Sequence, residues 1–201
     1  MRAALICVGK LKEKYWRDAV DEYLKRLTRY GQVEVIEVPD APEPAHPSPG
    51  ANAQVLQIEG ERILAKIKPD DVVIAADTIV VCNGEILGKP RDAADASRML
   101  HMLSGRDHQV MTGMTVLRGD MCRVCTEITD IHFRDLTDRE IDAYIRTGEP
   151  MDKAGSYGIQ GGAALFAERL VGDYYNVMGL PVCRLGQLLR EIAPEIMEES
   201  E

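Results

Sequence analysis

The sequence of 201 residues contains no apolar run long enough to cross a membrane. Its apolar N-terminal stretch, residues 3–8, is too short for the core of a signal peptide. No run of roughly 18 apolar residues, the length of a membrane-spanning helix, occurs elsewhere. We therefore predict a cytoplasmic protein that makes no membrane contact.

Positive charge is also in short supply. The chain has 24 Lys and Arg against 33 Asp and Glu, which gives a formal net charge of −9. Binding to nucleic acid through general electrostatics requires the neutralisation of many phosphates, so this charge argues against a nucleic-acid partner. A single small anion that is bound through a metal ion remains compatible with it.

Cysteine is scarce, and its spacing favours neither zinc nor redox chemistry. Two of the five cysteines, Cys122 and Cys125, have C-x-x-C spacing. No second pair or nearby His completes a tetrahedral zinc site, and a redox pair prefers a helix N-terminus to the strand-like run found here. We predict a structural role for the pair.

The most informative stretch runs from residue 70 to residue 92. An apolar run, residues 72–76, predicts a buried strand that ends on Asp77 and Thr78, and Asn83-Gly84 predicts a two-residue hairpin that returns the chain to Lys89. Asp77 and Lys89 could then converge on one anionic ligand, the acid through a metal and the lysine directly. The alternative is that this stretch forms only a strand and a surface hairpin, in which Asp77 serves as a cap and binds no ligand.

The order of the predicted elements indicates an α/β fold. We expect a mixed, mainly parallel central sheet with flanking helices, and a second lobe that contains a β-hairpin. Residues 1–74 predict a β-α-β-α-β run, whose crossovers favour parallel pairing. The elements of this run are strands at 3–8, 33–38 and 72–76, helices at about 15–30 and 55–67, and a proline-rich loop at 39–52.

Local signals divide the second half of the chain. Asp92 and Thr137 are predicted to cap helices that end at Gly105 and Gly148, and Pro181 suits the first turn of the last helix. Other expected segments are a strand pair at 109–117 and 121–133, a glycine-rich segment at 151–162, and a frayed acidic tail within 193–201.

Five sequence blocks follow one another between residues 70 and 192. They are Ala76-Asp77-Thr78; Gly84-Glu85 with Gly88-Lys89-Pro90; Leu103-Ser104-Gly105-Arg106-Asp107-His108; Asp152-Lys153-Ala154-Gly155-Ser156-Tyr157-Gly158-Ile159-Gln160-Gly161; and Asp173-Tyr174-Tyr175-Asn176-Val177-Met178-Gly179-Leu180-Pro181. Together these blocks closely resemble the Maf family of nucleoside triphosphate pyrophosphatases.

This resemblance implies hydrolysis of a nucleoside triphosphate to the monophosphate and pyrophosphate with a divalent cation, Mg²⁺ or Mn²⁺. It implies that Asp77 is the general base and a candidate metal ligand, that Lys89 contacts phosphate, and that Thr78 and Gln160 select the base. The Ala-Asp-Thr and Tyr-Gly-Ile-Gln-Gly blocks resemble the branch that acts on dTTP and UTP, not the one that prefers methylated GTP. Modified pyrimidine nucleotides are further candidate substrates, and a homodimer is compatible with the resemblance.

The chemistry agrees with these roles. A polyanion must have its charge neutralised before water attacks it, which in an acidic protein requires a metal and Lys89, with Arg106 and Lys153 as further candidates. Gln160 can both donate and accept hydrogen bonds, as reading a pyrimidine edge requires. The alternative for Arg106 and His108 is a structural place in a helix-to-strand turn.

The first half departs from the family pattern. Maf proteins begin with a strand that ends in Ser-x-Ser-Pro-Arg-Arg, whereas this chain has Cys7-Val8-Gly9-Lys10-Leu11-Lys12 there. Three further blocks are Val8-Gly9-Lys10-Leu11-Lys12, Glu22-Tyr23-Leu24-Lys25-Arg26-Leu27 and Val38-Pro39-Asp40. Through these blocks, residues 1–74 instead resemble the N-terminal half of the SPOUT-class methyltransferases that modify a pseudouridine in large-subunit ribosomal RNA. The cofactor site of that class lies in its C-terminal half, which is absent here, so methyl transfer is disfavoured. The chain resembles a chimera of these two families. Its origin is left open between a natural fusion, a designed swap and an artefact of sequence assembly.

Three hypotheses follow. In the first, the chain is a pyrophosphatase, weakened because Lys10, Lys12 and the N-terminus of the first helix replace the missing arginines. In the second, it is a catalytically inactive protein that binds nucleotides or associates with ribosomes. In the third, the two halves pack poorly because their interfaces were not matched to each other.

Overall fold

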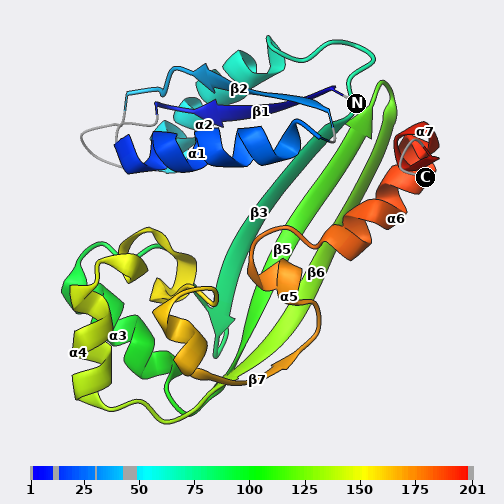
Figure 1. Cartoon of the computed structure of the whole chain (residues 1–201). Coiled ribbons are helices and arrows are strands. Elements are labelled where there is room, and N and C mark those ends of the chain that lie inside the picture. Colours follow the sequence, from blue (N-terminus) through cyan, green and yellow to red (C-terminus); the bar gives the residue numbers. More distant parts are fainter. Residues whose placement is uncertain (1, 11–13, 30, 43–48, 199–201) are drawn as a thin grey trace. The chain divides into compact units, whose positions relative to one another are not determined.

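The computed structural model describes residues 2–10, 14–29, 31–42 and 49–198. The chain divides into two compact units, Met1–Asp71 (unit 1) and Val72–Glu201 (unit 2), which Figure 1 shows in blue to cyan and in green to red. Among the described residues, no helix has both the length and the apolar composition that crossing a bilayer requires.

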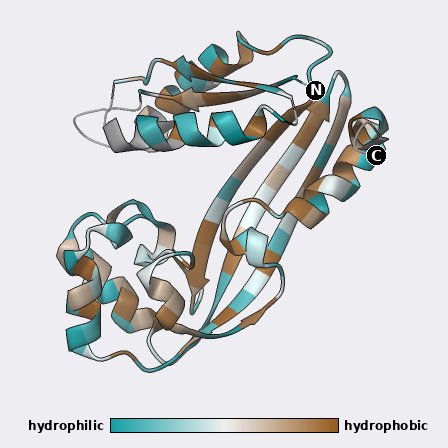
Figure 2. Ribbon diagram, viewed as in Figure 1, coloured by the Kyte–Doolittle hydropathy of each residue, from teal (hydrophilic) through white to brown (hydrophobic). Residues whose placement is uncertain are grey.

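Unit 1 is a β-α-β-α arrangement around two parallel strands. Gly9, with φ of 84°, continues the pairing beyond the first strand by donating its N–H to the carbonyl of Val38 at 2.8 Å. In Figure 2 the first strand is largely hydrophobic and the helix that follows it is largely hydrophilic. The elements are β1 (Arg2–Val8), α1 (Lys14–Leu27), β2 (Gln32–Val38) and α2 (Pro49–Leu64), with β1 and β2 paired in parallel.

The predicted proline-rich loop is shorter than expected. We predicted irregular structure over residues 39–52, but α2 begins at Pro49. A proline is tolerated in the first turn of a helix because its missing N–H would have no partner there. Residues 43–48 lie outside the described residues.

Unit 2 contains a sheet in which every neighbouring pair of strands is antiparallel. The prediction of a mainly parallel central sheet is therefore wrong, since β1 and β2 form the parallel pair of the described structure. Tight turns join β3 to β4 and β5 to β6, and a tight turn reverses the chain direction. The order across this sheet is β4 (Glu85–Leu87), β3 (Val73–Cys82), β5 (Asp107–Arg118), β6 (Met121–Phe133) and β7 (Ala167–Val171).

The hairpin between β3 and β4 is confirmed, but the predicted end of β3 is wrong. Asn83 and Gly84 have φ of 52° and 78°, as a two-residue turn with positive φ at both central positions requires. Strand β3 runs through Asp77 and Thr78 and ends at Cys82, because both residues continue the pairing with β5. The two polar residues therefore lie in the middle of a strand and not at its tip.

The helices of unit 2 begin where the capping signals predicted. The carboxylate of Asp92 accepts from the N–H of Asp95, and Thr137 forms a complete capping box with Glu140. Gly148, with φ of 77°, follows the second of these helices. The helical segments are α3 (Ala93–Leu103), α4 (Asp138–Arg146), η1 (Glu149–Asp152), η2 (Ala154–Ser156), η3 (Gly162–Leu165), α5 (Tyr174–Val177), α6 (Val182–Ile192) and α7 (Pro194–Glu198).

The acidic C-terminal segment is more ordered than predicted. We expected residues 195–201 to form the frayed end of the acidic tail at 193–201, but residues 194–198 form α7 and Ala193 is fully buried. The carboxylate of Glu195 accepts a hydrogen bond from the guanidinium of Arg118. Both α6 and α7 contribute to an apolar cluster that also contains Met114 and Val116 of β5.

The cysteine pair does not form a site in the described structure. Cys122 and Cys125 are both free thiols. They lie three positions apart on β6, so their side chains point to opposite faces of the sheet. No group of three or more potential metal ligands occurs among the described residues.

Candidate active site

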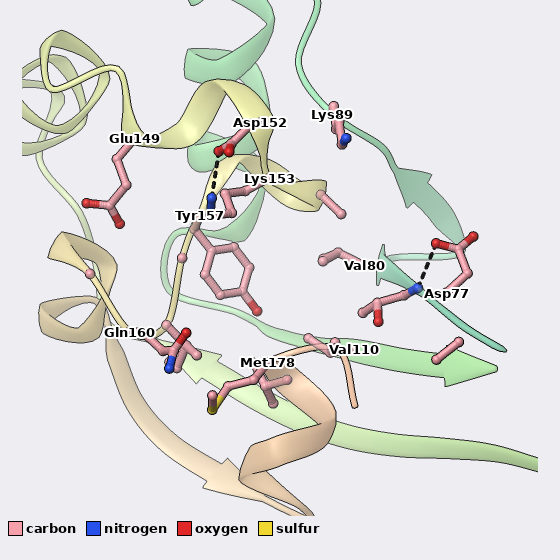
Figure 3. Close-up of a pocket in the computed structure, with 18 residues that line it drawn as sticks. Asp77, Val80, Lys89, Val110, Glu149, Asp152, Lys153, Tyr157, Gln160 and Met178 are labelled. Atoms are coloured by element: carbon pink, nitrogen blue, oxygen red, sulfur yellow. Dashed lines mark hydrogen bonds and ion pairs between the residues drawn. The ribbon is translucent and has the colours of Figure 1, made fainter. Parts of the chain in front are cut away.

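A cavity of about 560 Å³ in unit 2 brings together side chains that the sequence singled out separately. Its walls come from β3, the segment after β4, β5, residues 149–161 and residues 177–179. Figure 3 shows this cavity with its lining side chains. The predicted site residues that line it are Asp77, Thr78, Lys89, Lys153 and Gln160.

Asp77 and Thr78 are neighbours on β3, and both line the cavity. Asp77 lies opposite Gly113 on β5, and Thr78 lies opposite Thr112. The carboxylate of Asp77 is exposed at the rim of the cavity, and its Oδ1 accepts from the N–H of Thr78 at 2.9 Å. Figure 3 shows Asp77 and Gln160 at opposite sides of the cavity.

The hydroxyl of Thr78 belongs to a short buried chain of hydrogen bonds. It lies 2.8 Å from the hydroxyl of Thr112, which donates in turn to the carbonyl of Asn176 at 3.1 Å. The side-chain amide of Asn176 donates to the carbonyl of Val110 and to the hydroxyl of Thr129. These bonds tie the wall at residues 177–179 to the sheet, a role of Asn176 that sequence reasoning missed.

The backbone on either side of Lys89 is anchored, while its side chain is exposed. Before it, the carbonyl of Gly88 accepts from the N–H of Gly155 at 3.1 Å. After it, Pro90 is buried and the N–H of Arg91 donates to Asp95 at 3.2 Å. The ammonium group therefore reaches the cavity from a fixed stretch of chain.

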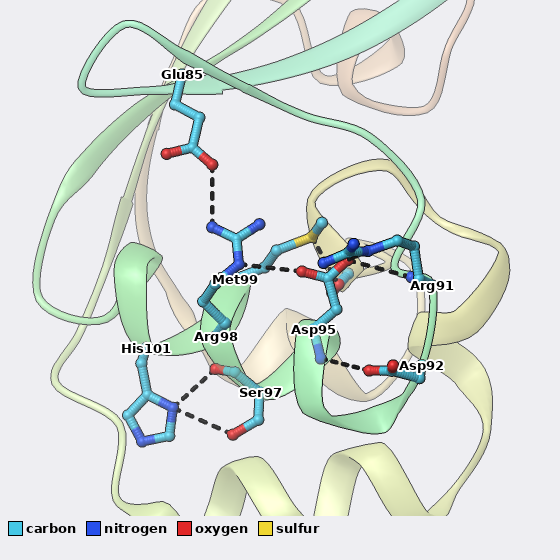
Figure 4. Close-up of polar contacts among 9 residues, drawn as sticks. Glu85, Arg91, Asp92, Asp95, Ser97, Arg98, Met99 and His101 are labelled. Carbon is cyan, nitrogen blue, oxygen red and sulfur yellow. Dashed lines mark hydrogen bonds and ion pairs between the residues drawn. The ribbon is translucent and has the colours of Figure 1, made fainter. Parts of the chain in front are cut away.

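Asp95 of α3 anchors the backbone that follows Lys89, and Figure 4 shows its contacts. Its carboxylate accepts from the backbone and guanidinium of Arg91 and from the guanidinium of Arg98. Arg98 also donates to Glu85 on β4 at 3.0 Å. The backbone bond from Arg91, followed by the bond from Arg98, lowers the pKa of Asp95 to about 2.

Lys153 and Gln160 come from the glycine-rich segment. The Lys153 ammonium already donates to the neighbouring carboxylate of Asp152 at 2.6 Å. Gln160 is exposed in the loop between η2 and η3. Glu149, which sequence reasoning missed, also lines the cavity and accepts from the N–H of Gly162 at 3.1 Å.

A buried histidine supports the floor of the cavity. The Nε2 atom of His108 lies 2.9 Å from the hydroxyl of Tyr157, which lines the cavity. Burial lowers the pKa of His108 to about 4, so the imidazole is neutral near pH 7. Its ring also packs edge-on against Phe133. His108 thus belongs to the core and not to a surface turn.

Arg106 is the predicted site residue of unit 2 that does not line the cavity. Arg106 is exposed and donates to the carbonyl of Met102 at 3.4 Å, as expected for a structural place in the helix-to-strand turn. Lys10 is exposed in unit 1 after β1. Lys12 lies outside the described residues. Contacts of these three with phosphate stay predictions.

The cavity suits a cation that takes few protein ligands. Of its three carboxylates, Asp152 is paired with Lys153, and Glu149 is held by Tyr144 and Gly162. Among the described residues, the carboxylate of Asp77 accepts only from the backbone N–H of Thr78. Mg²⁺ commonly uses one or two carboxylates, substrate phosphates and retained waters, so a single exposed carboxylate fits such an ion.

Comparison with known proteins points to one family. A family model described as Maf-like protein matches residues 21–192. A dTTP/UTP pyrophosphatase of Alkaliphilus metalliredigens is 49% identical over 136 residues, which cover 67% of this chain and 70% of that protein. A dTTP/UTP pyrophosphatase of Symbiobacterium thermophilum is 46% identical over 167 residues, which cover 82% of this chain and 86% of that protein.

The match reaches well before residue 70. It includes most of the segment in which we saw a resemblance to a SPOUT-class methyltransferase. The comparisons therefore do not support that resemblance or a chimeric origin, and they extend the family pattern into unit 1. The departure at residues 7–12 remains, because these residues precede the match.

Proposed function

The chain belongs to the Maf-like protein family, and we propose that it hydrolyses dTTP and UTP to the nucleoside monophosphate and pyrophosphate. Relatives named dTTP/UTP pyrophosphatase are 44–50% identical to it. The observation that carries the proposal is the convergence of Asp77, Thr78, Lys89 and Gln160 on one cavity. Asp77 and Thr78 lie on β3, Lys89 follows β4, and Gln160 lies between η2 and η3. The cavity volume of about 560 Å³ is typical of small-ligand sites.

The cavity has two ends with different chemistry. At one end Lys89 would donate to a phosphate oxygen, and Asp77 would accept the proton of the attacking water. At the other end Gln160 would read the edge of the base by donating and accepting hydrogen bonds. Water adds across the bond between the α and β phosphates, so one product keeps the nucleoside and the other is pyrophosphate.

A divalent cation, Mg²⁺ or Mn²⁺, belongs to the proposal. Asp77 together with phosphate oxygens of the substrate would hold it. When bound, such an ion neutralises phosphate charge and acidifies the water that it coordinates. Lys89 adds a second positive charge from a stretch of backbone that is fixed on both sides.

The Ser-x-Ser-Pro-Arg-Arg segment of the family pattern is missing from this chain. We therefore propose a lower rate of hydrolysis than in family members that have this segment. We propose Lys10 and Lys12 as phosphate contacts in its place, with modified pyrimidine nucleotides as further candidate substrates. A lysine cannot reproduce the bidentate fork of an arginine, so weaker binding of the triphosphate is expected. A homodimer and a cytoplasmic location stay predictions.

The test is pyrophosphate release from dTTP, UTP, GTP and ATP with Mg²⁺ or Mn²⁺, measured for the wild type and for Asp77→Asn. The matched control is Asp120→Asn, because Asp120 is exposed in the turn between β5 and β6. Release from dTTP and UTP that is lost in Asp77→Asn and kept in Asp120→Asn supports the proposal. Nucleotide binding without release, in a wild type that melts cooperatively, contradicts it and supports the inactive binding protein.

A further inference from the structure

We propose that Glu149 and Tyr144 act as positioning residues that hold the loop of Gln160 and thereby set the preference for the pyrimidine base. The inference rests on the proposed function, since it assigns a task at the same cavity. Neither residue was identified from the sequence. The loop in question, residues 158–162, carries Gln160 at its centre.

Both ends of the loop are bonded to this pair of side chains. The N–H of Gly158 donates to the Tyr144 hydroxyl at 3.0 Å, and that hydroxyl donates to Oε1 of Glu149 at 2.9 Å. The N–H of Gly162 donates to both carboxylate oxygens of Glu149, at 3.2 and 3.1 Å. A single hydrogen-bonded unit therefore closes the loop beneath Gln160.

The glycines of the loop are explained by this unit. A Cβ atom built on Gly161 would overlap the carboxylate of Glu149, and one on Gly158 would lie 3.1 Å from its Oε1. A Cβ on Gly162 would lie 3.2 Å from the ring of Tyr144. The backbone thus wraps closely around Glu149, which leaves Gln160 as the outward-facing polar side chain of the loop.

The pair is itself rigid. Tyr144 is 5% exposed, and its ring packs edge-on against Phe166 with centroids 5.2 Å apart. Burial raises the pKa of the Tyr144 phenol, so the hydroxyl keeps its proton and remains a donor to Glu149. Because this hydroxyl accepts from Gly158 at the same time, its removal releases one end of the loop directly and the other through Glu149.

The geometry assigns the pair to recognition of the base. Glu149 lines the cavity, but its oxygens are engaged by Tyr144 and Gly162. Lys89 lies on a different segment, which Gly155 and Asp95 anchor. Loss of the pair should therefore raise KM and reduce selectivity while kcat changes less.

The experiment measures kcat and KM for dTTP, UTP and GTP in Tyr144→Phe, Glu149→Gln and Glu149→Ala. The control is Glu168→Gln, because Glu168 is exposed on β7 and does not line the cavity. We expect KM for dTTP to rise about tenfold in Tyr144→Phe and Glu149→Gln, and more in Glu149→Ala, with a smaller fall in kcat. The preference for dTTP over GTP should fall in the same order, and Glu149→Gln should recover part of what Glu149→Ala loses.

The outcomes separate this inference from the proposed function. A wild type that releases no pyrophosphate from any nucleotide overturns the proposed function. A wild type that is active, with variants whose KM and selectivity are unchanged or whose kcat alone falls, overturns the inference and leaves the proposed function standing. If the Glu149 variants unfold, Tyr144→Phe decides, because it removes one oxygen and keeps the ring packing against Phe166.

Discussion

The hydroxyl oxygens of Thr78 and Thr112 lie 2.8 Å apart across β3 and β5. Thr112 is fully buried and donates its one proton to the carbonyl of Asn176. Thr78 must therefore donate its own proton to Thr112, which leaves only lone pairs for a ligand. The nearest atom to a Cβ built on Gly179 is this hydroxyl oxygen, at 3.5 Å, so the glycine keeps the cavity open beside it. Thr78 thus faces the cavity as an acceptor.

The first prediction concerns this polarity. Thr112→Val keeps the side-chain shape but removes the acceptor for Thr78 and the donor to Asn176, which should destabilise the fold by about 1–3 kcal/mol. Thr78 can then donate into the cavity, so the preference for UTP, whose base carries an N–H, over CTP, whose base carries an acceptor there, should fall. Denaturant unfolding and the ratio of the two kcat/KM values measure these effects. Thr115→Val, on the opposite face of β5, is the matched control, and an equal loss of preference in it contradicts the assignment.

The second prediction compares the two lysines of the cavity. Lys89→Met should lower kcat/KM for dTTP about 100- to 1000-fold, because it removes a donor that stabilises phosphate charge. Lys153→Met should lower kcat/KM by a smaller factor, because the Lys153 ammonium already donates to Asp152 at 2.6 Å. Steady-state pyrophosphate release measures both. Equal losses in the two variants would show that Lys153 leaves Asp152 to contact the substrate.

The third prediction follows from Asp95. Its pKa is lowered from 3.8 to about 2 in the folded state, so its contribution to stability is present above about pH 4 and is lost as the pH falls through 2. Asp95→Asn should lower the urea midpoint near pH 7, and the difference from the wild type should shrink on acidification. Activity should fall as well, because the backbone after Lys89 loses its anchor. A difference that stays constant between pH 7 and pH 2 argues against this account.

Local chemistry made much of the fold predictable. The Asn83-Gly84 hairpin and the caps at Asp92 and Thr137 depend on neighbouring residues, so short-range patterns identify them. The direction of strand pairing depends on contacts between distant segments, so the apolar run before Asp77 could not show that β3 pairs antiparallel with β5. For the same reason, the sequence did not indicate that β3 continues to Cys82.

The residues of the candidate site also differ in whether the sequence alone could identify them. Motif residues such as Asp77, Lys89 and Gln160 carry their own chemistry and could be identified by type and spacing. Glu149 and Asn176 act through bonds to backbone groups far along the chain, so no pattern near them announced their place. The glycines of residues 158–162 were the available signal, since closely spaced glycines indicate that another group approaches the backbone.

The last prediction uses the buried histidine as a pH probe of the cavity floor. The pKa of His108 is lowered to about 4 by burial, against 6.5 for an unfolded chain. The unfolded state therefore binds a proton more readily, so stability should fall as the pH drops from about 6.5 to 4, by on the order of 3 kcal/mol. His108→Gln keeps a partner for Tyr157 but cannot titrate, so its unfolding free energy should depend less on pH in this window. His101→Gln is the contrasting control, because Asp138 raises the pKa of His101 and its stabilising effect is lost as the pH rises. If wild type and His108→Gln lose stability in parallel between pH 6.5 and 4, His108 is not the titrating group. The assignment of a neutral imidazole to His108 beneath Tyr157 is then wrong.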